Sequence, residues 1–414
     1  QNSALGQQAL YSNTTGSDNT AFGKNALRDN TIGNYNTAIG RYSLTLNTTG
    51  NNNNGLGNSS LYNNTTGSSN VAVRHYSLFS NTTADNNVAV GDQSLFSNTT
   101  GRLNAALGSR SLRNNTTGDY ATGLGANALT ANTTGSGNTA VGTNAMESNT
   151  TGASNTVSGW NSLVSNTTGS YNVSMGVNSM FKNVEGSNNV AIGKSALYNS
   201  TVSGNVALGN EAMYSNTTGQ LNTAIGDGAL YNNTSGNLNT AVGRIALMAN
   251  TTGCNNTASG SYSLCKNTTG SGNTASGYMA LLKNTTGTMN TASGVYSMTD
   301  NTTGNYNAAF GSCSLHALTT GIRNTALGHA PLRANTTGRD NVGIGFASLL
   351  VNSTGCLNTA SGSYAMYSNT TGHSNTASGY KSLLSNTTGV LNDEFGTDTL
   401  ALSLIHISEP TRPE

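Results

Sequence analysis

The amino-acid sequence predicts an all-β protein, a parallel β-solenoid of about 24 coils with 17 residues in each coil. Three observations lead to this fold class. A 17-residue pattern recurs along almost the whole chain, and leucine or methionine occupies one place in every copy. The composition is the third observation, because 51 glycines and only 8% charged residues suit closely spaced turns better than ordinary helices.

The repeat is illustrated by residues 36–52, NTAIGRYSLTLNTTGNN, which define repeat positions 1 to 17 in the text below. Position 5 is glycine in every copy except one, where Arg74 replaces it. All intervals between these residues span 17 residues, apart from the 16 between Gly193 and Gly209, where we expect a shortened turn. An unfolded linker would have no reason to keep this spacing, so the periodicity favours an ordered repeat over disorder.

The elements of one coil follow from its residues in order. Positions 1 to 5, N-T-A-[VILS]-G, predict a short strand with the position 3 alanine inside and position 4 outside, because side chains alternate along a strand. Positions 8 to 11, which begin with Ala-Leu or Ser-Leu, predict a second strand. The glycines, including Gly40 and Gly57, and the N-T-T triplet predict turns that need positive φ.

Stacking turns every repeat position into a file of like residues. At the strand spacing of about 4.8 Å, 24 coils would form a rod on the order of 110 Å long. The predicted core file is position 9: Leu10, Leu27, Leu44, Leu61, Leu78, Leu95, Leu112 and Leu129. The predicted asparagine ladder, in which each side chain bonds to its neighbours above and below, is position 1: Asn19, Asn36, Asn53, Asn70, Asn87 and Asn104.

Each coil has a thin core, because it contributes little more than one leucine and one alanine. Apolar residues at position 4, such as Ile39, Val90 and Leu107, are expected to face outward and to need a covering surface. The sequence therefore predicts lateral association of identical chains, as a homotrimer.

The N-[TS]-[AV]-[AV]-I-G element followed by x-x-A-L resembles the head repeats of trimeric autotransporter adhesins. It is also similar to the repeat shafts of phage-type tail fibres, although the unit here is longer and carries N-T-T-G in addition. The resemblance implies a left-handed parallel β-roll that trimerises through its strand faces. It further implies a structural or adhesive fibre segment, extracellular on a cell or virion surface, whose partners are its own copies and a host-surface receptor or glycan.

Two alternatives arise from the threonines. The adjacent pair Thr48 and Thr49, repeated in most coils, resembles an ice-binding face, although such faces usually present T-x-T. The N-T-T triplet also matches an N-glycosylation acceptor, although the same three residues are typical of a hydrogen-bonded turn. The corresponding alternatives are a glycosylated structural filament and the shaft of a tailspike whose enzymatic part is missing. The candidate acceptors are Asn13, Asn47, Asn81, Asn132, Asn166, Asn216, Asn267, Asn301, Asn335 and Asn386.

No motif indicates catalysis, a cofactor or a metal, so we expect no enzyme activity. The four cysteines lack CxxC spacing and are expected to be free thiols. The histidines within the repeat are spread over three repeat positions and lack acidic companions nearby: His75, His316, His329 and His373. The balance of 17 Lys and Arg against 16 Asp and Glu gives no reason to expect nucleic-acid binding, and no apolar run reaches the roughly 18 residues of a membrane helix.

The repeat covers residues 1–401, which we expect to form one solenoid domain of a protein truncated at both ends. Residues 402–414, LSLIHISEPTRPE, break the frame and resemble the translation of a sequencing adapter. We expect no fold there.

Overall fold

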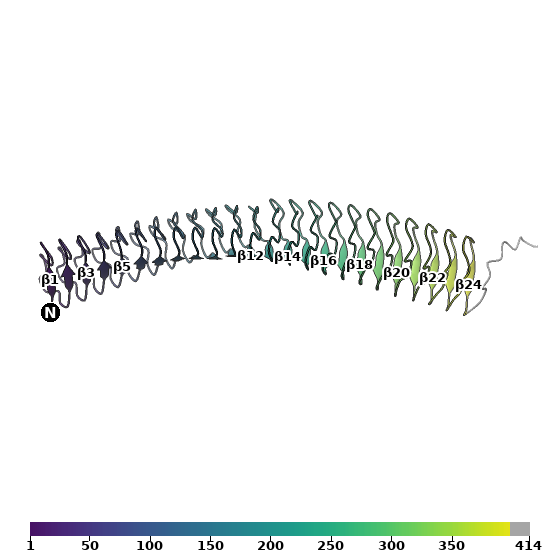
Figure 1. The fold of residues 1–414 in the computed structure, drawn as a ribbon, viewed down its shortest axis with the longest axis horizontal. Coiled ribbons are helices and arrows are strands. Elements are labelled where there is room, and N and C mark those ends of the chain that lie inside the picture. Colours follow the sequence, from purple (N-terminus) through teal and green to yellow (C-terminus); the bar gives the residue numbers. More distant parts are fainter. Residues whose placement is uncertain (398–414) are drawn as a thin grey trace, which may run out of the picture. The chain divides into compact units, whose positions relative to one another are not determined.

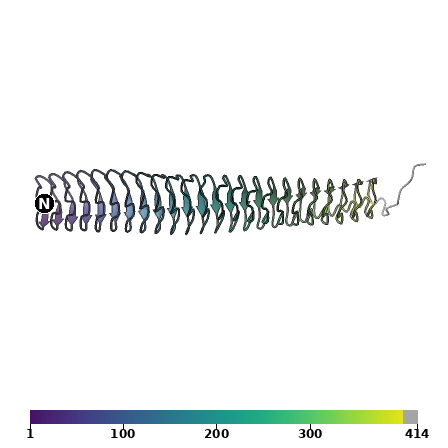
Figure 2. The ribbon, with the colours of Figure 1, turned by 90° about the horizontal axis from the view of Figure 1, so that it is seen from above.

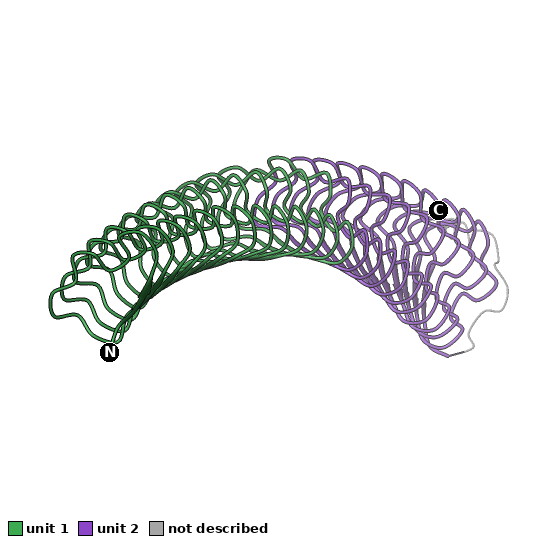
Figure 3. Ribbon diagram, turned by 60° about the vertical axis from the view of Figure 1, so that its left-hand side comes forward, with its two compact units in different colours: residues 1–218 green, residues 219–414 purple. Residues whose placement is uncertain are grey.

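The computed structural model describes residues 1–397 and contains 24 parallel strands, each of three residues, with no helix in that range. The chain is an all-β solenoid of about 23 turns, as the periodicity predicted, and each coil contributes one strand. It divides into two compact units, residues 1–218 and residues 219–414, shown green and purple in Figure 3. The expected unfolded tail, residues 402–414, and the last repeat residues, 398–401, lie outside the described residues.

In the first unit, strands of successive coils lie side by side (Figures 1 and 2). They pair in parallel at identical repeat positions. Thr37, for example, lies between Thr20 and Asn54. The strands are β1 (Ser3–Leu5), β2 (Thr20–Phe22), β3 (Thr37–Ile39), β4 (Asn54–Leu56), β5 (Val71–Val73), β6 (Val88–Val90), β7 (Ala105–Leu107), β8 (Thr122–Leu124), β9 (Thr139–Val141), β10 (Thr156–Ser158), β11 (Val173–Met175), β12 (Val190–Ile192) and β13 (Val206–Leu208).

The second unit repeats the same arrangement. Thr274 lies between Thr257 and Thr291, so the register is again kept at the repeat position. Its strands are β14 (Thr223–Ile225), β15 (Thr240–Val242), β16 (Thr257–Ser259), β17 (Thr274–Ser276), β18 (Thr291–Ser293), β19 (Ala308–Phe310), β20 (Thr325–Leu327), β21 (Val342–Ile344), β22 (Thr359–Ser361), β23 (Thr376–Ser378) and β24 (Asp393–Phe395).

The core of each coil is made by positions 3 and 9. Ala38 and Leu44 are both fully buried, whereas Ile39 at position 4 keeps 39% of its surface exposed. This alternation follows from the two-residue period of a strand. The predicted core leucines from Leu27 to Leu129 are fully buried, and Leu10, in the first coil, is half-buried.

The prediction of a second strand at positions 8 to 11 was wrong, because these residues form a turn. Leu44 has a φ of 51°, in the left-handed region that leucine rarely adopts. Its amide donates to the carbonyl of Ser60 in the next coil at 2.9 Å, and its carbonyl accepts from the Asn47 amide at 3.2 Å. The stacked coils therefore hold a backbone conformation that the residue type alone would not favour.

The two glycine files serve different purposes. Position 5 needs positive φ as predicted, for example 128° at Gly40. Position 15 does not: Gly50 has an ordinary φ, and the expectation of positive φ was wrong there. A Cβ on Gly50 would instead lie 2.6 Å from the side-chain oxygen of Asn47, so close packing selects the small residue.

The 16-residue coil contains a shortened turn, as expected, and its core is unchanged. Leu197 and Met213, on either side of the shortening, are both fully buried. The side chain of Asn189 donates to the carbonyl of Val202 at 2.8 Å, the bond that other coils make to a position 15 glycine. One residue is therefore lost from the outer turn without disturbing the file of core residues at position 9.

Candidate functional site: the ladders and the outward strand face

The predicted asparagine ladder at position 1 runs through the interior of the first unit. The side-chain oxygen of Asn19 accepts from the Asn36 amide at 3.0 Å and from the Asn36 side chain at 3.2 Å. The same Asn36 side chain donates to the carbonyl of Gly50 at 2.9 Å. The predicted members Asn19, Asn36, Asn53, Asn70, Asn87 and Asn104 are all at most 1% exposed. Buried amides are stable only when paired, and this geometry pairs them.

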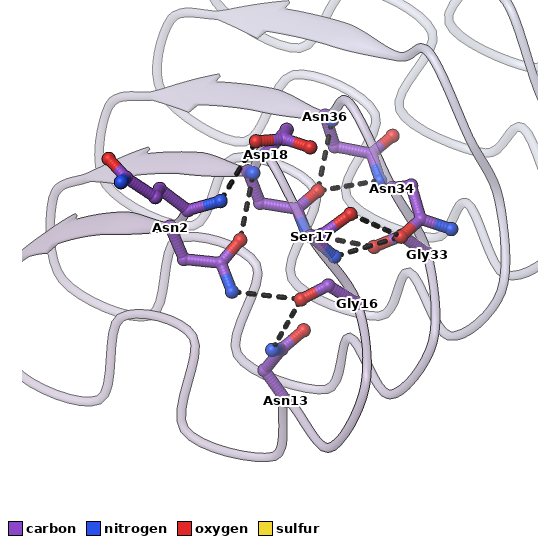
Figure 4. Close-up of polar contacts among 10 residues, drawn as sticks. Asn2, Asn13, Gly16, Ser17, Asp18, Gly33, Asn34 and Asn36 are labelled. Carbon is purple, nitrogen blue, oxygen red and sulfur yellow. Dashed lines mark hydrogen bonds and ion pairs between the residues drawn. The ribbon is translucent and has the colours of Figure 1, made fainter.

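A second asparagine ladder, at position 12, was not predicted. Asn47 donates to the side-chain oxygen of Asn30 at 2.8 Å, and Asn64 donates to that of Asn47 at 2.8 Å. The two ladders meet on the position 15 carbonyl: Figure 4 shows Gly16 accepting from Asn2 at 2.8 Å and Asn13 at 3.0 Å. The signal for this ladder was the recurrence of asparagine at position 12 in nearly every coil, which was interpreted as a glycosylation motif.

The position 12 asparagines are the proposed glycosylation acceptors, and their environment argues against that role in the folded coil. Asn13, in the first coil, is half-buried. The other nine are at most 1% exposed, which leaves no space for a glycan on the amide nitrogen: Asn47, Asn81, Asn132, Asn166, Asn216, Asn267, Asn301, Asn335 and Asn386. The N-T-T triplet therefore acts as a hydrogen-bonded turn.

Two natural breaks in the position 12 ladder reveal what it contributes. Leu318 replaces asparagine in one coil, and the buried side-chain oxygen of Asn301 in the preceding coil has no hydrogen-bond partner. Ser200 replaces it in the shortened coil, and the side-chain oxygen of Asn183 is likewise unpaired. Each position 12 asparagine thus donates a hydrogen bond to the side-chain oxygen of the asparagine before it. Where another residue replaces asparagine, that buried oxygen has no partner.

The adjacent threonines differ in their contacts. The hydroxyl of Thr48 donates to the carbonyl of Thr65 in the next coil at 3.0 Å, so it closes the stack instead of facing solvent freely. Equivalent bonds join Thr31 to Thr48 and Thr65 to Thr82. Position 14, occupied by Thr66 and its equivalents, is exposed in most coils. Only one threonine of each pair is therefore available to an outside ligand.

The outward strand face presents positions 2 and 4, and its chemistry differs between the units. In the first unit position 4 is a file of large apolar residues, interrupted by Ser158 and including Phe22 at 41% exposure and Leu107 at 51%. In the second unit five strands read Thr-Ala-Ser, with the alanine inside and both hydroxyl residues outside: β16, β17, β18, β22 and β23. This T-x-S pattern lies on the strand and not at the N-T-T turn.

Charged residues also pair in register. The Nζ of Lys283 lies 2.8 Å from Oδ1 of Asp300, and the Nε of Arg323 lies 2.6 Å from Oδ1 of Asp340. In each pair the two residues belong to adjacent coils. Hydrogen bonds from Arg323 hold the pKa of Asp340 below its ordinary value. His75 forms a similar pair with Asp92, its Nδ1 lying 3.2 Å from a carboxylate oxygen. The expectation that no acidic residue accompanies the histidines was therefore wrong for His75. Because the repeat is 17 residues long, Asp92 is the residue that follows His75 in the next coil, and the sequence alone could have shown this.

Within residues 1–397, no cluster of three or more histidines, cysteines and carboxylates could hold a metal ion. The same residues include no helix long and apolar enough to cross a membrane. All four cysteines are free, as expected: Cys254, Cys265, Cys313 and Cys356. No protein-family description matches the chain, and no curated protein matches it significantly.

Proposed function

We propose that the chain is a structural segment of an extracellular fibre, which gives reach and presents a repetitive surface. The observation that carries this proposal is the continuity of hydrogen bonding within each unit. Most interior coils are joined to the next by strand pairing, by two asparagine ladders and by a threonine hydroxyl. Such stacks resist bending and local opening because each residue is held from both sides.

The extracellular location and the adhesin or tail-fibre role are supported by the resemblance of the repeat. An adhesin would place a signal peptide before the repeats and a membrane anchor after them, whereas a tail fibre would place a chaperone domain after them. Sequencing the complete gene distinguishes these two. A gene encoding a catalytic domain fused to the repeats would instead support the tailspike alternative.

The proposed partner is a second and third copy of the same chain, which would cover the apolar file of the first unit. Sedimentation equilibrium of residues 1–397 should give three times the monomer mass. Replacing Ile39 and Leu56 by lysine should yield monomers, while lysine at exposed Thr66, on the turn, should leave the trimer intact. A wild-type monomer would overturn the trimer and leave the mechanical role standing.

Ice binding is the second candidate function. The Thr-Ala-Ser strands support it better than the adjacent threonines of the N-T-T turn, because they place two hydroxyl residues outward on either side of a buried alanine. Thr257, Thr274 and Thr291 lie in register beside a parallel file of serines, which forms a regular array of outward hydroxyls. This candidate predicts thermal hysteresis that disappears when Thr274 becomes tyrosine and persists when exposed Thr286 becomes tyrosine. Wild-type protein without thermal hysteresis would exclude it.

A further inference from the structure

One coil, residues 70–86, departs from the repeat at both glycine files. Arg74 replaces glycine at position 5, and Ala84 replaces it at position 15. Arg74 has a φ of 95°, whereas the position 5 glycines range from 117° at Gly345 to 144° at Gly57. A non-glycine residue in this region is strained, so the fold tolerates a cost here that it avoids in every other described coil.

The cost has a visible cause. A Cβ built on Gly40 would lie 2.6 Å from the carbonyl oxygen of Gly57 in the next coil, closer than real Cβ atoms approach. Arg74 carries such a Cβ beside the next coil, and its backbone has turned away from the φ of the file. Glycine would remove this conflict. An arginine kept at such a place is a candidate for a role that glycine cannot perform.

The surroundings of Arg74 form an open groove of about 660 Å³. It is lined by Arg74, His75 and Asp92, with Val90 and Leu107 as apolar walls. Arg74 and His75 are exposed, and within residues 1–397 no carboxylate pairs with the Arg74 guanidinium. The groove therefore combines an available cation with apolar contact area.

The histidine in this groove is held in a defined orientation. An ionised Asp92 can only accept, so His75 donates its Nδ1 proton to that carboxylate, at 3.2 Å. Its ring also packs on Tyr76, with 3.7 Å between the ring centroids. In the neutral ring the other nitrogen, Nε2, is then an acceptor that can receive a hydroxyl hydrogen.

We propose that this groove binds an acidic sugar. The Arg74 guanidinium pairs with the carboxylate, for which its fork of N–H donors is suited. The Nε2 of His75 accepts from a sugar hydroxyl, while the apolar face of the ring rests on Val90 and Leu107. Such a site goes beyond the mechanical role, which does not depend on it. It requires Val90 and Leu107 to stay open to the ligand, so at these two coils it is an alternative to coverage by further copies of the chain.

The test uses ligand-observed NMR with D-glucuronic acid as the probe and D-glucose as its neutral counterpart. Wild-type residues 1–414 should show saturation transfer to D-glucuronic acid and much less to D-glucose. Arg74→Gly should weaken D-glucuronic acid binding about tenfold or more, because a charge-assisted bond is lost. The same change should raise the thermal midpoint, because it restores the glycine file, so lost binding cannot be ascribed to unfolding.

Two further variants make the result specific. Arg102→Gln, which removes an arginine at repeat position 16, should leave binding unchanged. His75→Gln should weaken binding while keeping the preference for the charged sugar. Wild-type protein that binds neither sugar, or that binds both equally, would overturn the proposal, as would an Arg74→Gly protein that binds D-glucuronic acid as well as wild type.

Discussion

At the scale of the residue, asparagine performs the work that large apolar side chains perform in thicker proteins. In most coils the position 12 asparagine donates both to the asparagine before it and to the position 15 carbonyl, as Asn64 does to Asn47 and Gly67. An interior built from amides is stable only when the chain of donors and acceptors is complete. Single breaks should therefore be measurable.

Completing the ladder at Leu318 should stabilise the second unit. Leu318→Asn gives the unpaired oxygen of Asn301 a donor, and it should contribute about 1 kcal/mol locally. Hydrogen exchange followed by mass spectrometry should slow at residues 301–335. Leu238→Asn, at a half-exposed leucine of the same unit, serves as the matched control and should leave exchange at residues 301–335 unchanged. Unchanged exchange in Leu318→Asn would contradict the ladder's contribution.

Interrupting the ladder at Asn64 should have the opposite effect. Asn64→Ala leaves the buried oxygen of Asn47 without its donor, which should cost about 1–3 kcal/mol. Amide exchange in the two adjacent coils should accelerate by tenfold or more. Asn63→Ala removes a neighbouring, partly exposed asparagine and should have little effect. Equal exchange in the two variants would show that the ladder does not stabilise the stack.

The cysteines allow a chemical check of burial. Burial raises the pKa of the Cys265 thiol, whereas Cys254 and Cys356 are only half-buried. A raised pKa leaves less of the reactive thiolate at any given pH, so Cys265 should be alkylated by iodoacetamide more slowly than the other two at pH 8. Peptide mapping by mass spectrometry gives the three rates. Fast alkylation of Cys265 in the folded protein would mean that its coil opens readily.

At the scale of the element, the sequence predicted the strand and missed the turn. The strand could be predicted because Ala38 and Ile39 alternate in size, and the alternation states which side chain faces inward. The left-handed Leu44 could not be predicted, since leucine has no intrinsic preference for that region and only the adjacent coils impose it. The contacts between stacked coils therefore determine the backbone conformation of Leu44, which its own residue type does not.

The same distinction applies to the candidate sites. The position 1 ladder was predicted because like residues stack when coils are in register. The pairing of His75 with Asp92 follows from the same arithmetic, yet it was overlooked because nearby companions were sought along the chain. The strain at Arg74 needed the structure, because φ values and the space around a Cβ cannot be read from residue type.

At the scale of the whole molecule, a solenoid depends on period more than on sequence. Each described strand pairs only with the strands of adjacent coils, as β5 does with β4 and β6, so removing one full coil should bring equivalent surfaces together. Deleting residues 87–103 joins Asn86 to Asn104 and keeps every file continuous. We expect this variant to keep the β-sheet circular dichroism spectrum of the parent and a similar thermal midpoint.

Deleting half a coil should be far more harmful than deleting a whole one. Removal of residues 87–94 takes away fewer residues, but it places the position 9 residue Leu95 directly after Asn86, where position 1 is due. The following core and ladder residues then lose their partners, and buried amides would face apolar surface. Amide exchange should accelerate in the coils on both sides. If both variants kept the same stability, the stacked files would not be the source of stability. If only the variant with the 17-residue deletion stayed folded, the files would be required.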